Sequence, residues 1–293
     1  MNERPEITVI IPVWNGEKRI GATLAAIADQ TLPRSRFEVI VVDNGSTDGT
    51  VAVAQRFPFV KLLSEPQPGS YRARNRALAE ASGEYVLFTD GDCVPAPDWI
   101  EQAAAVTARL PAAGIYAGHV KLFREAKGDP FSARYEELTA FNQKRNAEEL
   151  NCCVTANWLC RLELMRSVGG FNQELLSGGD IECSRRIVAA GHKLVYVPEM
   201  IVGHPTRGSL LELIRKRRRV VGGRWQLYGS FQKRTRHWAK RLTRESVSQA
   251  RWVAGSDIES WAKPGVVAIV GILMITSLFE LARLASGRPA YRS

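Results

Sequence analysis

The chain has 293 residues, of which 45% are hydrophobic and 24% are charged, and its formal net charge is +10. These values are typical of a folded protein with one large core or two modest ones, and they exclude a disordered or collagen-like chain. The charge is unevenly placed, because residues 205–263 hold fifteen Lys and Arg but four Asp and Glu. The basic character therefore belongs to one segment, and the rest of the chain is close to neutral.

The first 110 residues alternate apolar runs of strand length with segments of helical spacing. The runs rich in β-branched and aromatic side chains, which we expect to be strands, are 7–13, 37–43, 59–63 and 84–90. The segments between them that contain good helix formers are 17–30, 48–57 and 70–82. Strand–helix repetition with nearly continuous apolar strands predicts an α/β protein whose parallel sheet is covered on both faces.

The pattern becomes less regular after residue 110. The further segments expected to be strands are 114–123, 152–160 and 192–198. The polar segment 131–150 is expected to form one helix, and residues 181–191 another. A boundary is expected near residues 204–208, where the basic segment begins.

An uncharged apolar run, residues 265–279, lies near the C-terminus. As a helix it would be roughly 22 Å long, which is shorter than the hydrocarbon core of a bilayer, and an extension to Ala285 adds Glu280 and Arg283. It could be a buried C-terminal helix. Alternatively, it spans or lies on a membrane, which the tryptophans interleaved with basic residues before it favour, since that combination suits an anionic lipid surface.

The five cysteines are expected to be free thiols. None of them forms a CxxC pair, so a zinc site or a disulfide framework is not indicated. They are Cys93, Cys152, Cys153, Cys160 and Cys183.

Carboxylates gather where the predicted strands end. Asp43 closes one strand, and Asp90 and Asp92 follow another in the stretch FTDGDC. Each could be a turn residue. Two neighbouring carboxylates repel each other unless donors or a cation neutralise them, and Mg²⁺ or Mn²⁺ takes oxygen ligands together with substrate phosphates. No GxGxxG or GxxxxGK[ST] loop is available to bind phosphates instead.

Five blocks of the chain resemble, in order and spacing, the signature blocks of family 2 glycosyltransferases. They are TVIIPVWNGE, VVDNGSTDGT, PGSYRARNRAL, FTDGDC and GGFNQELLSGGDIECSRRI, within about residues 5–205. The resemblance implies the GT-A fold, a Rossmann-like mixed sheet. It also implies an inverting transfer of a sugar from a nucleotide diphosphate donor to an acceptor hydroxyl.

The resemblance further implies a domain plan. Residues 1–205 would form the GT-A catalytic domain, with a donor-binding half at about 1–110 and an acceptor-binding half at about 111–205. A basic, aromatic-rich helical region at 206–263 and a hydrophobic C-terminal helix at 264–293, acting as a membrane anchor, would follow.

The family's donor site can be transferred to this chain residue by residue. Asp43 resembles the carboxylate that accepts hydrogen bonds from the nucleotide base, with Pro12 and Glu17 lining the same pocket. Arg74 resembles the arginine near the base and phosphates, and Asp90 the first aspartate of the DxD motif, near ribose or metal. We expect a UDP-sugar, although thymine and guanine offer donors that Asp43 could accept equally well.

The expected metal ligands and catalytic base also follow from the resemblance. Asp92, with Asp90 and His204, would bind Mg²⁺ or Mn²⁺ on the diphosphate, and His204 could alternatively be an ordinary loop histidine. Asp180 resembles the catalytic base. A carboxylate at a helix start can remove the proton of an attacking hydroxyl, while a metal stabilises the leaving diphosphate.

Two departures from the family pattern stand out. Gly179 occupies the position where the family usually has Glu, which puts the positioning of the acceptor in question. The processive motif QxxRW is matched only at Arg224 and Trp225, without its Gln, so we expect a single-addition enzyme.

The expected partners are a nucleotide-sugar donor, a glycan or lipid-linked acceptor and an anionic membrane surface. The excess of Lys and Arg before residues 265–285 would place the enzyme at the cytoplasmic face of the membrane. The run 215–219 could instead be a solvated helix face or bind nucleic acid, but no nucleic-acid motif supports the latter. A nucleotidyltransferase and a catalytically silent sugar-nucleotide scaffold remain alternatives.

Overall fold

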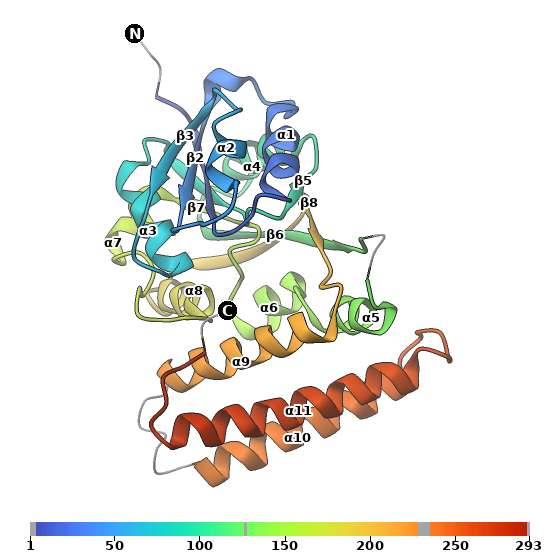
Figure 1. The fold of residues 1–293 in the computed structure, drawn as a ribbon. Coiled ribbons are helices and arrows are strands. Elements are labelled where there is room, and N and C mark those ends of the chain that lie inside the picture. Colours follow the sequence, from blue (N-terminus) through green and yellow to red (C-terminus); the bar gives the residue numbers. More distant parts are fainter. Residues whose placement is uncertain (1–3, 126–127, 228–234, 292–293) are drawn as a thin grey trace. The chain divides into compact units, whose positions relative to one another are not determined.

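The computed structural model of the chain describes residues 4–125, 128–227 and 235–291 (Figure 1). The chain divides into two compact units, each described here by itself. The sheet unit comprises Met1–Lys121, Phe141–Glu174 and Gly179–His204. The helical unit comprises Leu122–Ala140, Leu175–Gly178 and Pro205–Ser293.

The sheet unit is built on a mixed sheet, which is eight-stranded over the part of the chain that the structure describes. The strands are β1 (Ile7–Val13), β2 (Phe37–Asp43), β3 (Val60–Ser64), β4 (Tyr85–Phe88), β5 (Val94–Pro95), β6 (Ala113–Phe123), β7 (Trp158–Arg161) and β8 (Lys193–Pro205). Their order is β3-β2-β1-β4-β7-β6-β8-β5. β1 pairs in parallel with β2 and β4, and β2 with β3, whereas β7 is antiparallel to both β4 and β6.

Helices accompany this sheet in the alternation that the sequence predicts. They are α1 (Ile20–Ala28), α2 (Thr50–Ala54), α3 (Ser70–Glu80), α4 (Trp99–Arg109), α6 (Gln143–Leu150), α7 (Leu162–Ser167) and α8 (Gly179–Ala189), with a short 3-10 helix at Arg34–Arg36. Every residue of β1 is buried, as are all but one of β2, so these strands lie in the core rather than at a solvated face. The α/β class and the strands near residues 7–13, 37–43, 59–63 and 84–90 are thus confirmed.

Two predictions of secondary structure were wrong. Residues 131–150 form two helices, α5 (Pro130–Thr139) and α6, because Phe141 adopts a positive φ of 53° and Asn142 caps the second helix by accepting from the backbone N–H of Arg145. The break coincides with a boundary between the two units. In the segment 152–160, only the residues of β7 form a strand. The residues before it form a turn, in which the buried side-chain amide of Asn157 donates to the backbone carbonyls of His119 and Met200.

The helical unit consists of α5, α9 (Leu210–Leu227), α10 (Thr235–Ala254) and α11 (Lys263–Ala285). α10 and α11 run antiparallel, side by side (Figure 1). The apolar core between the helices is formed by Tyr135, Leu213, Val253, Val266, Ile269, Val270 and Leu273, with Trp238, Leu242 and Leu281 in a second cluster. The expected helical C-terminal extension is therefore present.

Buried ion pairs hold the start of the basic segment inside this unit. Glu136 is 1% exposed, and its carboxylate accepts from Arg207 at 2.8 Å and from Lys216 at 2.7 Å. Burial alone would raise the pKa of Glu136, but Lys216 and Arg207 outweigh it and lower the pKa to about 2. Arg217 donates to the hydroxyl of Tyr135, so members of the basic run 215–219 have internal partners.

α11 is long and apolar enough to cross a membrane, and no other helix of the described residues meets this test. Length and composition alone also fit a buried core helix of a soluble protein. The contacts of each face of α11 therefore have to decide whether residues 265–285 form a buried helix, span a membrane or lie on one.

Candidate active site

The ends of β1 and β2 position three of the predicted nucleotide-binding residues. Pro12 is buried in β1, one residue before the partner of Asp43 in β2. The carboxylate of Asp43 accepts the backbone N–H of Ser46 at 3.2 and 3.3 Å, so it also closes the turn after β2. Glu17 follows β1, and its carboxylate accepts the backbone N–H of Gly49 at 3.2 Å.

The aspartates that follow β4 lie beside a histidine near the end of β8. Asp90, Asp92, Cys93 and His204 each present one possible ligand atom, all within 4.8 Å of one another. The Nε2 atom of His204 is 3.7 Å from the carboxylate of Asp92, and the ring of Phe141 packs on the imidazole. The side chains of Asp90 and Asp92 are about one-third exposed, at 32% and 33%, whereas His204 is 5% exposed. The two carboxylates therefore border accessible space, whereas the imidazole of His204 is buried beside Asp92.

This group of side chains fits a hard divalent cation. Carboxylate oxygens are the preferred ligands of Mg²⁺ and Mn²⁺, and an imidazole can complete the set. Cys93, which the sequence did not suggest, is a poor fourth ligand, because burial together with the charges of Asp90 and Asp92 raises the pKa of its thiol well above the ordinary value. A protonated, fully buried thiol belongs to the core. The fitting ligands are thus Asp90, Asp92 and His204.

Arg74 brings a buried positive charge to this cluster. It lies in α3, is 3% exposed, and forms an ion pair with Asp90. Within residues 4–125, 128–227 and 235–291, no hydrogen-bond acceptor is found for its buried Nε atom. A buried N–H without an acceptor is costly, so Arg74 retains a donor that an anionic ligand could satisfy.

Asp180 is the second residue of α8 and accepts a hydrogen bond from the hydroxyl of Tyr71 at 3.2 Å. Burial raises the pKa of Asp180, and the backbone N–H of Ile181, the charge of Arg74 and the Tyr71 hydroxyl oppose this effect. Burial and the negative charge of Asp180 raise the pKa of Tyr71, so its hydroxyl remains a donor. A carboxylate with a raised pKa at a helix start is suited to accept a proton.

The ring of Tyr71 explains why the residue before Asp180 is a glycine. A Cβ atom at Gly179 would lie 2.8–2.9 Å from the ring of Tyr71, closer than real Cβ contacts allow. The ring is itself fixed, since Tyr71 is 6% exposed and stacks on Phe171 with 5.8 Å between the ring centroids. While Tyr71 holds this position, residue 179 has no room for a side chain.

A continuous series of contacts joins the candidate base to the candidate metal ligands. Asp180 contacts the hydroxyl of Tyr71, the guanidinium of Arg74 lies 5.8 Å from the centre of the Tyr71 ring, and Arg74 pairs with Asp90 of the cluster. The three residues at the ends of β1 and β2 are outside this series. Sequence reasoning missed Tyr71, although it stands within the block PGSYRARNRAL.

Comparison with known proteins identifies a family and a fold. The family model described as glycosyl transferase family 2 matches residues 8–169. The glycosyltransferase AglE of Haloferax volcanii is 35% identical over 229 residues, which cover 76% of this chain and 74% of AglE. A pre-mycofactocin glycosyltransferase of Mycobacterium tuberculosis is 30% identical over 74% of this chain and 46% of its own length.

Solved structures share the fold at lower identity. A mannosyltransferase of Pyrobaculum calidifontis, solved with GDP-Man and Mn²⁺, is 24% identical, with a TM-score of 0.58 over 97% of this chain and 76% of its own. TarS 1–349 of Staphylococcus aureus, solved with UDP-GlcNAc, is 18% identical, with a TM-score of 0.57 over 97% and 92% of the two chains. The fold is accordingly GT-A, as the sequence predicts.

Proposed function

Because this chain belongs to glycosyltransferase family 2, we propose that it moves a sugar from a nucleoside diphosphate donor to an acceptor hydroxyl with inversion at the anomeric carbon. The observation that carries the proposal is the series of contacts from Asp180 through Tyr71 and Arg74 to the cluster at Asp90. It links a proton acceptor with groups that bind negative charge. An inverting transfer needs both.

The proposed donor site runs from the ends of β1 and β2 to Arg74. Asp43 would accept from the nucleotide base, with Pro12 and Glu17 beside it, and the free Nε–H of Arg74 would donate to the diphosphate. We propose a UDP-sugar as the donor. The two structural neighbours were solved with UDP-GlcNAc and with GDP-Man, which supports a nucleotide sugar as the donor without selecting the base.

Asp90, Asp92 and His204 would hold Mg²⁺ or Mn²⁺ against the diphosphate. When bound there, such a cation supplies positive charge against the negative charge that develops as the diphosphate leaves. The partly exposed carboxylates of Asp90 and Asp92 support this role, because they border accessible space and lack a full set of protein donors in the region described.

Asp180 would act as the general base. Its carboxylate would take the proton of the acceptor hydroxyl as the oxygen attacks the anomeric carbon on the face opposite the diphosphate. Tyr71 would hold the carboxylate in place through the hydrogen bond to Oδ1. The backbone N–H of Ile181 also donates to Oδ1, so Oδ2 would take the proton of the acceptor.

For the acceptor we propose a lipid-linked or cell-surface glycan. Residues 1–110 would form the donor half and 111–205 the acceptor half of the catalytic domain. Residues 206–263 and 264–293 would attach the enzyme to the cytoplasmic face of a membrane. The basic composition of 205–263 and the apolar helix α11 support this attachment.

Calorimetric titration with UDP, dTDP and GDP, each with Mn²⁺ and then with EDTA, tests the donor site. We expect metal-dependent binding of one nucleotide, abolished in Asp92→Ala. Asp98→Ala is a matched control, because Asp98 bonds to Gln102 and lies outside the cluster. A folded protein that binds none of the three would refute the proposed site.

The product identifies the reaction. With the donor sugar and a glycan acceptor, a glycosyltransferase releases a nucleoside diphosphate, whereas a nucleotidyltransferase releases pyrophosphate. The anomeric configuration of the product, read by NMR coupling constants, reports inversion. A product with the donor's configuration would contradict direct attack assisted by Asp180.

A further inference from the structure

One face of α11 is exposed and entirely apolar. The residues of α11 whose side chains are exposed are Pro264, Ala268, Ile272, Ile275, Phe279, Ala282 and Ala285. Their spacing of three or four residues places them along one side of the helix. Ile275 and Phe279 are 65% and 64% exposed, so large apolar side chains meet solvent at the middle of this stripe. A continuous apolar stripe of this kind marks an interaction surface.

The opposite face of α11 is fixed within the helical unit. Glu280 is fully buried, and its carboxylate accepts from Arg218 of α9 at 2.8 Å and from Arg283. Leu273 and Leu281, on the same side, pack in the apolar clusters of the unit. A membrane-spanning α11 would have to give up these contacts. The carboxylate of Glu280 would then enter hydrocarbon without its partner Arg218 of α9, together with the charge of Arg283, which is costly.

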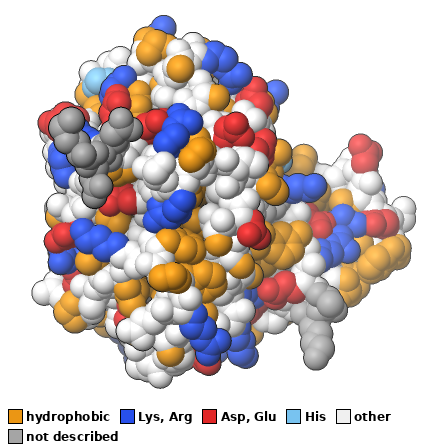
Figure 2. Space-filling view, turned by 90° about the horizontal axis from the view of Figure 1, so that it is seen from above, with side chains coloured by type: hydrophobic (Ala, Val, Ile, Leu, Met, Phe, Trp, Pro, Cys, Tyr) orange, Lys and Arg blue, Asp and Glu red, His pale blue; other side chains and the backbone are white. Residues whose placement is uncertain are grey.

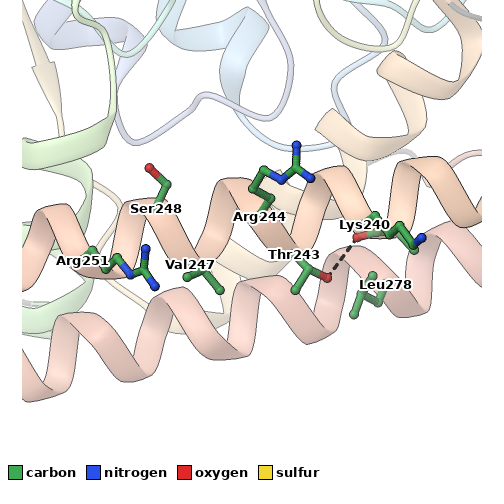
Figure 3. Close-up of a pocket in the computed structure, with 8 residues that line it drawn as sticks. Lys240, Thr243, Arg244, Val247, Ser248, Arg251 and Leu278 are labelled. Carbon is green, nitrogen blue, oxygen red and sulfur yellow. Dashed lines mark hydrogen bonds between the residues drawn. The ribbon is translucent and has the colours of Figure 1, made fainter.

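A basic groove runs along α10 and borders this apolar stripe. It has a volume of about 600 Å³ and is lined by Ala239, Lys240, Thr243, Arg244, Val247, Ser248 and Arg251 of α10 and by Leu278 of α11 (Figure 3). Lys240, Arg244 and Arg251 form no ion pair with any carboxylate in the described part of the chain. Leu278 lies three residues after Ile275 on α11, so the groove and the apolar stripe adjoin.

Aromatic side chains continue this surface at the turn between the two helices. Trp252, near the end of α10, and Trp261, just before α11, are 51% and 61% exposed. Hydrophobic side chains lie beside Lys, Arg and acidic ones at the end of the helical hairpin, at the right of Figure 2. Tryptophan prefers the headgroup level of a bilayer, where its ring is partly buried and its N–H is wet.

We propose that the α10–α11 hairpin lies flat on an anionic phospholipid bilayer, with the apolar stripe of α11 in the interface and Lys240, Arg244 and Arg251 on lipid phosphates. Charge complementarity selects this occupant, because three cations that have no ion pair among the described residues border an apolar stripe that is itself uncharged. α11 does not cross the bilayer. The inference rests on the membrane attachment proposed above and specifies its geometry.

Sedimentation of the full chain with sucrose-loaded vesicles tests the lipid contact. We expect binding to phosphatidylcholine vesicles that contain phosphatidylglycerol, weaker binding without it, and a loss at high salt. Each basic residue near such a surface contributes about fivefold to partitioning, so Lys240→Gln, Arg244→Gln and Arg251→Gln together should lower it about 100-fold. Equal binding to both kinds of vesicle would overturn the phosphate contact.

Two further variants control for charge and for the apolar stripe. The combination Arg56→Gln, Lys144→Gln and Lys193→Gln removes the same charge from exposed positions of the sheet unit and should change partitioning far less. Ile275→Ser with Phe279→Ser should lower partitioning at least tenfold, as expected when apolar side chains leave an interface. If the sheet-unit variant lost as much partitioning, net charge alone would explain the binding, and the proposed membrane-binding surface would be refuted. Thermal melting checks that each variant folds, and no nucleotide is needed, so the outcome is independent of donor binding.

Thiol labelling decides between lying and spanning. Ser260 and Ser286 flank α11 and are exposed, while the native cysteines are all buried. In inside-out membrane vesicles from expressing cells, a membrane-impermeant maleimide should label both Ser260→Cys and Ser286→Cys. Labelling of Ser260→Cys alone would show that α11 spans the bilayer and would overturn the proposal.

Discussion

Replacing Tyr71 by Phe should shift the pH dependence of catalysis while leaving the fold in place. The change removes the hydrogen bond to Asp180 but keeps the ring that stacks on Phe171. A hydrogen bond to an ionised group contributes about 1.5–3 kcal/mol. The oxygen–oxygen distance of 3.2 Å is long for such a bond, so the lower value applies. Because about 1.4 kcal/mol corresponds to one pKa unit, the pKa of Asp180 should rise by about one unit.

The acid limb of kcat/KM against pH reports this change. The base is active when ionised, so activity falls as the pH drops through its pKa, and in Tyr71→Phe the fall should begin about one pH unit higher. Tyr116→Phe is the matched control, because it also removes a buried hydroxyl, bonded to the carbonyl of Leu110, but at a site away from Asp180. If the acid limb of Tyr71→Phe coincided with those of the wild type and the control, the assigned role of Tyr71 would be wrong.

Three further predictions concern crowded or buried positions. Gly179→Ala should lower kcat about tenfold with little change in donor KM, since the new methyl group would displace the Tyr71 ring; equal kcat would contradict the contact. Gly118→Ala should destabilise the protein by about 1–3 kcal/mol in urea denaturation, because its Cβ would lie 2.3–2.5 Å from the bonded side chain of Asn157; unchanged stability would contradict this packing. The pKa of Glu136 is lowered from 4.5 to about 2. Its ionised form therefore contributes about 3 kcal/mol to the free energy of unfolding above pH 4.5, and this contribution is lost as the pH falls towards 2. Glu136→Gln should flatten that part of the stability–pH curve, and an unaltered acid transition would contradict the ion pairs.

The parallel strands and their aspartates were readable from the sequence because both depend on local patterns. Apolar runs give β1 and β2, and Asp43 and Asp90 follow the ends of such runs, where a parallel sheet gathers its loops. The proximity of His204 to Asp92 could not be derived in this way. More than a hundred residues separate them, and the resemblance to a family alone suggested the contact.

Long-range partners decided the features that the sequence did not reveal. At the break between α5 and α6, the ring of Phe141 contacts the ring of His204, and this contact is not encoded locally, although Asn142 is a local N-cap of α6. The segment that contains Glu136 joins the helical unit through Arg207 and Lys216, which lie far along the chain. Similarly, the run 215–219 looks like a surface patch until its partners are known.

The buried carboxylate of Glu280 fixes how α11 is rotated and positioned along its neighbouring helices. A helix that is apolar all round can rotate or slide by a turn against its neighbours at little cost, since one aliphatic contact replaces another. The pairing of Glu280 with Arg218 of α9 removes that freedom, because another register would separate these two buried charges, whereas Arg283 moves with Glu280 on the same helix. We infer that this ion pair fixes the register of α11, so that the same apolar stripe always faces outward. Glu280→Leu combined with Arg218→Leu should preserve the helix but allow more than one register against α9. Hydrogen exchange along α11 would detect this change as lost protection, and full protection would contradict the inference.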